Sequence, residues 1–69
     1  MNSIYKIIEI VGSSATTWED AARKAMETAA KSLKEVRIGE IKGFDVRMEN
    51  GKVIEYRVKI AVSFKYLPE

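Results

Sequence analysis

The C-terminal part of the chain alternates apolar and polar residues, and this alternation constrains the fold more than any other feature. From Ile54 to Tyr66 every even-numbered residue is branched aliphatic or aromatic, and every odd-numbered residue is charged or small. Successive side chains of a β-strand point to opposite faces of a sheet, so the pattern predicts a strand with one apolar face. At ~3.3 Å per residue this strand is about 43 Å long. A compact domain of this length would be only roughly 28 Å across.

A strand of that length leaves apolar surface that a single subunit cannot cover. The chain has 69 residues and no cysteine, so neither a large core nor disulfides can stabilise it. One helix of about 27 Å is too short to cover the whole apolar face. The sequence therefore predicts a closed homo-oligomer, in which other copies of the chain shelter the remainder.

The rest of the chain predicts one strand, one helix and a second strand before the long final strand. Residues 4–11 are rich in β-branched and aromatic types, which favours a strand. Thr17 is a suitable N-cap for an amphipathic helix over residues 18–33. A second strand is expected over residues 36–47, and Asn50-Gly51 then favours a tight hairpin turn. These elements predict a single α+β domain over residues 1–69 with the order β-α-β-β.

Two further features concern how closely the helix and the sheet approach each other. The apolar helix face is mostly alanine, which permits a short distance between the helix and a strand, and Trp18 is expected to provide core or interface packing at its start. Gly39 and Gly43 interrupt the second strand. A glycine inside a strand indicates either a bulge or a close approach by another group.

Composition excludes several classes of function. The sequence has no histidine and no cysteine, so it lacks an imidazole or thiolate for catalysis or metal binding, and we expect no enzymatic activity. The net charge is +2, with basic and acidic residues interleaved, which argues against nucleic-acid binding. The first residues do not predict a signal peptide, and no apolar run reaches ~18 residues, so we expect a soluble cytoplasmic protein without membrane association.

Three segments resemble the dodecin family: Tyr5–Ser14, Thr17–Ala21 and Glu49–Gly51. The resemblance covers nearly the whole chain. It implies a three-stranded antiparallel sheet partly wrapped around one helix, and a hollow homododecamer with cubic 23 symmetry. It also implies a small-molecule binding or storage role, with FMN or riboflavin as the family's usual ligand.

The resemblance also implies a flavin pocket, whose positions here are Ile38, Gly39, Asp45 and Arg57. Flavin-binding members stack the ring on a Trp, which corresponds to Ile38, and hydrogen-bond it with a Gln, which corresponds to Arg57. Isoleucine has no aromatic face, and arginine donates hydrogen bonds but accepts none. Flavin binding is therefore expected to be weak or absent. The chain instead resembles a Trp-less branch of the family that includes calcium dodecins.

Three functions remain open: a storage dodecamer for a small molecule, a calcium-buffering dodecamer, or a structural shell without a ligand. Calcium needs six to eight oxygen ligands, and the acids are too dispersed for a site within one chain, so Glu40 and Glu55 are candidate ligands only where symmetry gathers several copies. Glu55, Arg57 and Lys59 form a charged row, which is either a set of solvated or intersubunit ion pairs or the polar lining of a pocket for an anionic ligand.

Overall fold

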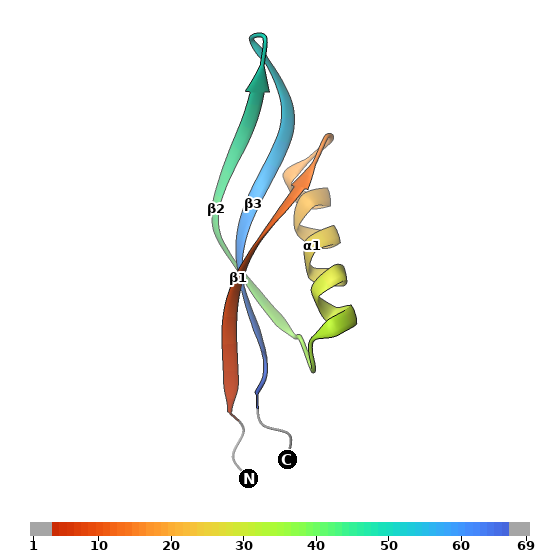
Figure 1. Cartoon of the computed structure of the whole chain (residues 1–69), viewed down its shortest axis with the longest axis vertical. Helices are drawn as coiled ribbons and strands as arrows, with labels where there is room; N and C mark the ends of the chain where they lie inside the picture. The colour runs from red at the N-terminus through yellow and green to blue at the C-terminus, as the bar shows by residue number, and fades with distance from the viewer. Residues whose placement is uncertain (1–3, 67–69) are drawn as a thin grey trace.

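A computed structural model describes residues 4–66 of the chain and shows three strands and one helix (Figure 1). They are β1 (Tyr5–Ser14), α1 (Trp18–Ser32), β2 (Ile38–Glu49) and β3 (Lys52–Lys65). The β-α-β-β order predicted from the sequence is confirmed. Within this part of the chain, no helix is both long and apolar enough to span a membrane.

The sheet is antiparallel with strand order β1-β3-β2, so the long β3 lies at its centre. Ile60 of β3 is opposite Ile10 of β1 and Ile41 of β2. The helix packs on one face of the sheet, and the β2–β3 hairpin extends well beyond it (Figure 1). The fold is therefore the predicted three-stranded sheet with one helix, drawn out along the direction of β3.

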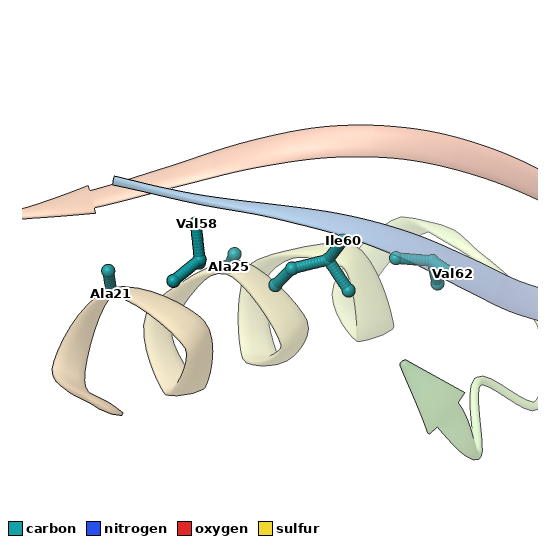
Figure 2. Packing of buried hydrophobic residues seen from close by; sticks show 5 residues of the cluster. All are labelled: Ala21, Ala25, Val58, Ile60 and Val62. Carbon is teal, nitrogen blue, oxygen red and sulfur yellow. The ribbon is translucent and has the colours of Figure 1, made fainter. Parts of the chain in front are cut away.

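The core lies where the middle of β3 meets α1. Val58, Ile60 and Val62 are completely buried, and they face Ala21 and Ala25 of the helix (Figure 2). Alanine has a short side chain, so the helix axis can lie close to the strand and the three β3 side chains can fill the space between them. Burial of a Val or Ile side chain contributes roughly 1.5–3 kcal/mol, which makes this small cluster the main apolar contribution to folding.

The strand glycines serve the two purposes that the sequence left open. A Cβ atom on Gly12 would lie 2.5 Å from the Ala21 carbonyl oxygen, and one on Gly39 would lie 2.6 Å from the Met26 Cε. These two glycines allow the helix to approach the sheet. Gly43 has nothing within 4 Å of its Cβ position and lies instead at a register shift in the β2–β3 pairing.

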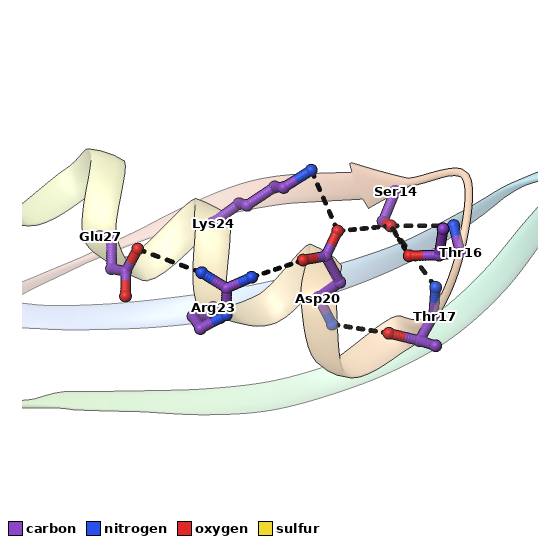
Figure 3. Close-up of polar contacts among 7 residues, drawn as sticks. All are labelled: Ser14, Thr16, Thr17, Asp20, Arg23, Lys24 and Glu27. Atoms are coloured by element: carbon purple, nitrogen blue, oxygen red, sulfur yellow. Dashed lines mark hydrogen bonds and ion pairs between the residues drawn. The ribbon is translucent and has the colours of Figure 1, made fainter.

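The start of α1 is fixed by a network of hydrogen bonds (Figure 3). Thr17 is the N-cap, and its side-chain oxygen accepts a hydrogen bond from the Asp20 backbone N–H at 2.9 Å. The buried Ser14 hydroxyl donates to the Asp20 carboxylate at 2.7 Å and accepts from the Thr16 backbone N–H at 3.0 Å. Lys24 also pairs with Asp20 at 3.0 Å. The Thr17 bond satisfies a backbone N–H group that a helix start leaves without a partner, and the other contacts hold the Asp20 carboxylate beside it.

The β2–β3 hairpin runs past the start of α1 and is largely uncovered (Figure 1). Its turn consists of Asn50 and Gly51 with φ values of 52° and 76°, as the Asn-Gly pair predicted. The molecule measures 53 × 19 × 13 Å, and its radius of gyration is 14.1 Å, whereas a compact chain of this length has about 11 Å. Large apolar side chains remain exposed, for example Phe44 at 62%.

The close approach at Gly12 leads to a first prediction. We expect Gly12→Ala to destabilise the protein by about 1–3 kcal/mol, the usual cost of overpacking a core, because the new methyl group would collide with the helix backbone at Ala21. Thermal unfolding at fixed protein concentration measures the change. Gly43→Ala is the matched control, with open space at its Cβ position. Equal melting temperatures for the two variants would contradict this account.

Candidate ligand-binding site

The face of the sheet opposite α1, called here the outer face, carries most of the residues predicted to bind ligands. Directly opposed residues of an antiparallel pair project to the same face. The odd-numbered side chains of β3 from 55 to 65 point away from the buried Val58, Ile60 and Val62, and Ile38, Glu40 and Asp45 of β2 are paired with three of them. Gly39 is paired with Val62 and approaches Met26, so it lies toward the helix.

A β-bulge determines which residue of β2 faces Arg57. The pairing shifts by one residue between Ile41 and Gly43, and Asp45 then lies directly opposite Arg57. Without that extra residue, Phe44 would be opposite Arg57 and the Asp45 side chain would point toward the helix side, because a slip of one residue exchanges the faces of a strand.

Asp45 and Arg57 form a two-pronged ion pair on the outer face. The Arg57 Nε donates to Asp45 Oδ1 at 2.7 Å, and its Nη2 donates to Asp45 Oδ2 at 3.0 Å. This pairing lowers the pKa of the Asp45 carboxyl below its ordinary value of 3.8 and raises the pKa of Arg57. The geometry is the planar, parallel arrangement that arginine makes with carboxylates. Arg57 is thus held by a partner within its own chain.

A second ion pair continues the charged row toward the hairpin. The Arg47 Nε donates to the Glu55 carboxylate at 2.9 Å. Hydrogen bonding to Arg47, and secondarily to Ser13, lowers the pKa of Glu55 below its ordinary value of 4.5. Glu40, the other predicted metal ligand, lies 3.9 Å from Lys42 and is mostly exposed. Glu55 is therefore engaged by a cation, whereas Glu40 is only loosely paired.

A pocket of about 290 Å³ lies where β2 begins, at the far end of the charged row from the hairpin. Its lining includes Ile38, which is 64% exposed, and the Tyr5 side chain from β1. Ser63 of β3 lies opposite Ile38, and Glu35 and Arg37 complete the lining from the segment before β2. Sequence reasoning identified Ile38 but missed Tyr5, Glu35 and Arg37, which come from parts of the chain that only the fold brings together.

One chain does not bring the predicted residues into a single site. Ile38 pairs with Ser63, which is six residues along β3 from Arg57, a separation of about 20 Å. The same spacing separates Glu55 from Ala61, the partner of Glu40. In residues 4–66 no three carboxylates gather into a group that could hold a metal ion. Any site that uses both ends of this face requires residues from more than one copy.

A larger groove of about 420 Å³ runs between β1 and α1. Its walls include Ile8 and Ile10 from the strand and Ala25, Ala29 and Leu33 from the helix. In the sequence, the feature that indicates this groove is the series of small residues on the helix face, which leaves space between the helix and the edge strand β1. The groove lies on the helix side of the sheet, away from the predicted ligand positions.

Comparison with known proteins agrees with the fold and with the resemblance. The Dodecin family model matches residues 4–67. The chain belongs to the dodecin family. It is similar to calcium dodecin of Mycobacterium tuberculosis, with 39% identity over 66 residues that cover 96% of this chain and 93% of the relative.

Solved dodecin structures superpose closely on this chain. The calcium-chelating immunodominant antigen calcium dodecin of Mycobacterium tuberculosis, described with a novel calcium-binding site, has a TM-score of 0.86 and 40% identity, and the match covers 97% of this chain and 96% of that one. Dodecin from Streptomyces coelicolor has a TM-score of 0.90 and 25% identity, with coverage of 99% and 97%. The fold is therefore that of the dodecins along nearly the whole chain.

The two lowered carboxyl pKa values predict how stability depends on pH. A carboxyl whose pKa is lower in the folded state contributes stability above its unfolded pKa and loses it as the pH falls through the folded pKa. For Asp45 and Glu55 this loss occurs below about pH 4. We expect Arg57→Gln to reduce stability modestly at pH 7 and to flatten the decrease in stability below pH 4, as measured by urea unfolding from pH 7 to pH 2.5. Lys31→Gln, on the exposed helix surface, should retain the wild-type profile. If the stability of Arg57→Gln fell below pH 4 as steeply as that of the wild type, the ion pair would not contribute to the pH dependence of stability.

Proposed function

We propose that this dodecin is a small-molecule binding and storage protein that forms a hollow homododecamer and has little or no affinity for flavin. The observation that carries the proposal is the Asp45–Arg57 ion pair. Arg57 lies where flavin-binding members of the family are expected to use Gln, and Ile38 lies where they are expected to use Trp. The lack of histidine and cysteine in the sequence supports a non-catalytic role.

The apolar surface that the fold leaves uncovered supports the oligomer. Ile7 and Ile38 are each 64% exposed on the outer face, and Phe44 is 62% exposed on the helix side of the hairpin. Apolar surface on both faces of an extended sheet is typical of a subunit that packs against other copies of itself. The two edge strands of the sheet, β1 and β2, also each have one edge that is not paired within the described residues of the chain.

The ion pair makes the Arg57 position a poor substitute for a neutral amide. A glutamine side chain both donates and accepts hydrogen bonds, whereas the guanidinium only donates. Arg57 would also have to give up part of its two-pronged bond with Asp45 before it could contact a ring. At Ile38 the aromatic stacking contribution, about 0.5–1.5 kcal/mol beyond the buried area, is lost. Both changes reduce flavin affinity.

A calcium-binding dodecamer is the second candidate, favoured by the 39% identity to calcium dodecin. Glu40 is the stronger candidate ligand because its side chain is 68% exposed and its contact with Lys42 is long, whereas Glu55 is already bound by Arg47. Six to eight oxygens are needed. Several copies of Glu40, brought together at a symmetry axis, would have to supply them with water molecules.

Native mass spectrometry tests the assembly and the flavin site together. We expect the wild-type protein to appear as twelve copies of 7.8 kDa, about 94 kDa, without bound riboflavin after incubation with it. The double variant Ile38→Trp/Arg57→Gln should keep the same copy number and bind riboflavin at least about tenfold more tightly, since two stacking and hydrogen-bonding contacts are restored. Quenching of riboflavin fluorescence measures the affinity.

Ile38→Leu is the matched control for the flavin experiment, because it preserves apolar volume without adding an aromatic face. This variant should quench riboflavin fluorescence no more than the wild-type protein does. Micromolar riboflavin affinity in the wild-type protein would overturn the proposed loss of flavin binding, and a stable monomer of about 8 kDa would overturn the assembly. A dodecamer that binds no small molecule and no metal would favour the structural shell.

The calcium candidate predicts a different calorimetric result. Titration of the assembled protein with calcium should release or absorb measurable heat, and Glu40→Gln should abolish the signal while leaving the copy number unchanged. Glu49→Gln, an exposed acid near the hairpin turn, is the control. A wild-type titration without heat, supported by equilibrium dialysis that detects no bound calcium, would remove this candidate.

A further inference from the structure

The indole of Trp18 joins the start of α1 to the strand that carries Asp45. Its Nε1–H donates a hydrogen bond to the backbone carbonyl of Asp45 at 3.2 Å. The Trp18 ring also contacts Phe44 and Tyr56, with centroid distances of 5.6 and 5.1 Å and interplanar angles of 69° and 75°. These are edge-to-face arrangements, which aromatic pairs prefer. The helix start, β2 and β3 therefore meet at one side chain.

The contacts of Trp18 lie directly behind the Asp45–Arg57 ion pair. Phe44 precedes Asp45 in β2, and Tyr56 precedes Arg57 in β3. Successive residues of a strand project to opposite faces, so Phe44 and Tyr56 lie on the helix side of the sheet while the ion pair lies on the outer face. Trp18 thus contacts the chain neighbour of each member of the pair, from the other side of the sheet.

Trp18 binds β2 just beyond the bulge, where the register of the strand can change. The pairing of β2 with β3 shifts by one residue between Ile41 and Gly43. A Cβ atom at Gly43 would have nothing within 4 Å, so side-chain packing at this glycine does not hold the shift in place. A slip by one residue would exchange the faces of Phe44 and Asp45. The hydrogen bond and the ring contact that Trp18 makes with these two residues oppose that slip.

We propose that Trp18 is a positioning residue for the Asp45–Arg57 ion pair and acts through its hydrogen bond to the Asp45 carbonyl. The bond holds β2 in the register that directs the Asp45 carboxylate to Arg57 on the outer face. This inference deepens the proposed function and rests on it, because the ion pair is the feature that is proposed to disfavour flavin. Trp18 lies on the helix side, so its effect on ligand choice depends on Arg57.

The titration of Asp45 reports the position of its carboxylate. The sequence has two aspartates, Asp20 and Asp45, so labelling with aspartate that carries carbon-13 at the carboxyl group gives two signals in the assembled protein. In the wild-type protein, hydrogen bonding to Arg57 lowers the pKa of Asp45 below its ordinary value of 3.8. We expect Trp18→Phe, which lacks the N–H, to raise the pKa of Asp45 toward that value. The pKa of Asp20, which is lowered chiefly by the Ser14 hydroxyl, should stay unchanged.

Two further variants separate the hydrogen bond from a general loosening of the fold. Ala29→Gly weakens α1 away from Trp18, because glycine is a poor helix former, and should lower the melting temperature without changing the pKa of Asp45. A synthetic chain with benzothienylalanine in place of Trp18 keeps the shape of the ring but has sulfur instead of the N–H, and should raise the pKa of Asp45. An unchanged Asp45 pKa in an assembled protein without the N–H, or an equal rise in Ala29→Gly, would overturn the proposal.

Riboflavin binding tests the consequence for ligand choice. Ile38→Trp supplies an aromatic face while Arg57 remains, and adding Trp18→Phe should raise riboflavin affinity about threefold, the effect of one weak net hydrogen bond. Trp18→Phe should have no effect in Ile38→Trp/Arg57→Gln, which has no ion pair to weaken. An equal effect in both backgrounds would overturn the route through Arg57. Absence of riboflavin binding in Ile38→Trp/Arg57→Gln would contradict the proposed function instead, and the Asp45 titration would still decide the role of Trp18.

Discussion

The packing of three β3 side chains against two helix alanines governs the rest of this molecule. Val58, Ile60 and Val62 are fully buried because Ala21 and Ala25, together with Gly12 and Gly39, let the helix lie close to the sheet. The close contact is also short. A helix of 15 residues covers about 22 Å, whereas β3 has 14 residues and is about 46 Å long. The core therefore stabilises only the middle of the sheet.

The spacing of residues along β3 explains why the predicted ligand positions are divided. Ile38 and the Asp45–Arg57 pair lie on the same face, but six β3 residues separate their partners, which is about 20 Å. In the proposed assembly, a small ligand that contacts both positions would bridge copies. Binding and assembly would then be thermodynamically linked, because a ligand held between subunits stabilises the assembled form.

The sequence predicted the elements well and the details of the site less well. Alternation in β3, the Asn-Gly turn and the Thr17 N-cap are local signals, and each was confirmed. The pairing of Asp45 with Arg57 depends on a bulge near Gly43, and the sequence allowed either a bulge or a close approach at that glycine. Positive φ at Glu35 had no sequence signal, since glutamate is not a residue that favours it. Residues whose role depends on register or on a strained loop were therefore the ones that pattern reasoning missed.

In the proposed function, the Asp45–Arg57 ion pair would affect ligand choice more than folding. Both side chains of the pair are more than a third exposed, and exposed ion pairs contribute little to stability because water and salt screen them. Their geometry is nonetheless specific, since two parallel N–H donors are committed to one carboxylate. A neutral ring at this position would have to compete with Asp45 for the guanidinium. An incoming anion would be repelled by Asp45 but attracted to Arg57 and the neighbouring Lys59, so in the proposed function Asp45 opposes both kinds of ligand at this position.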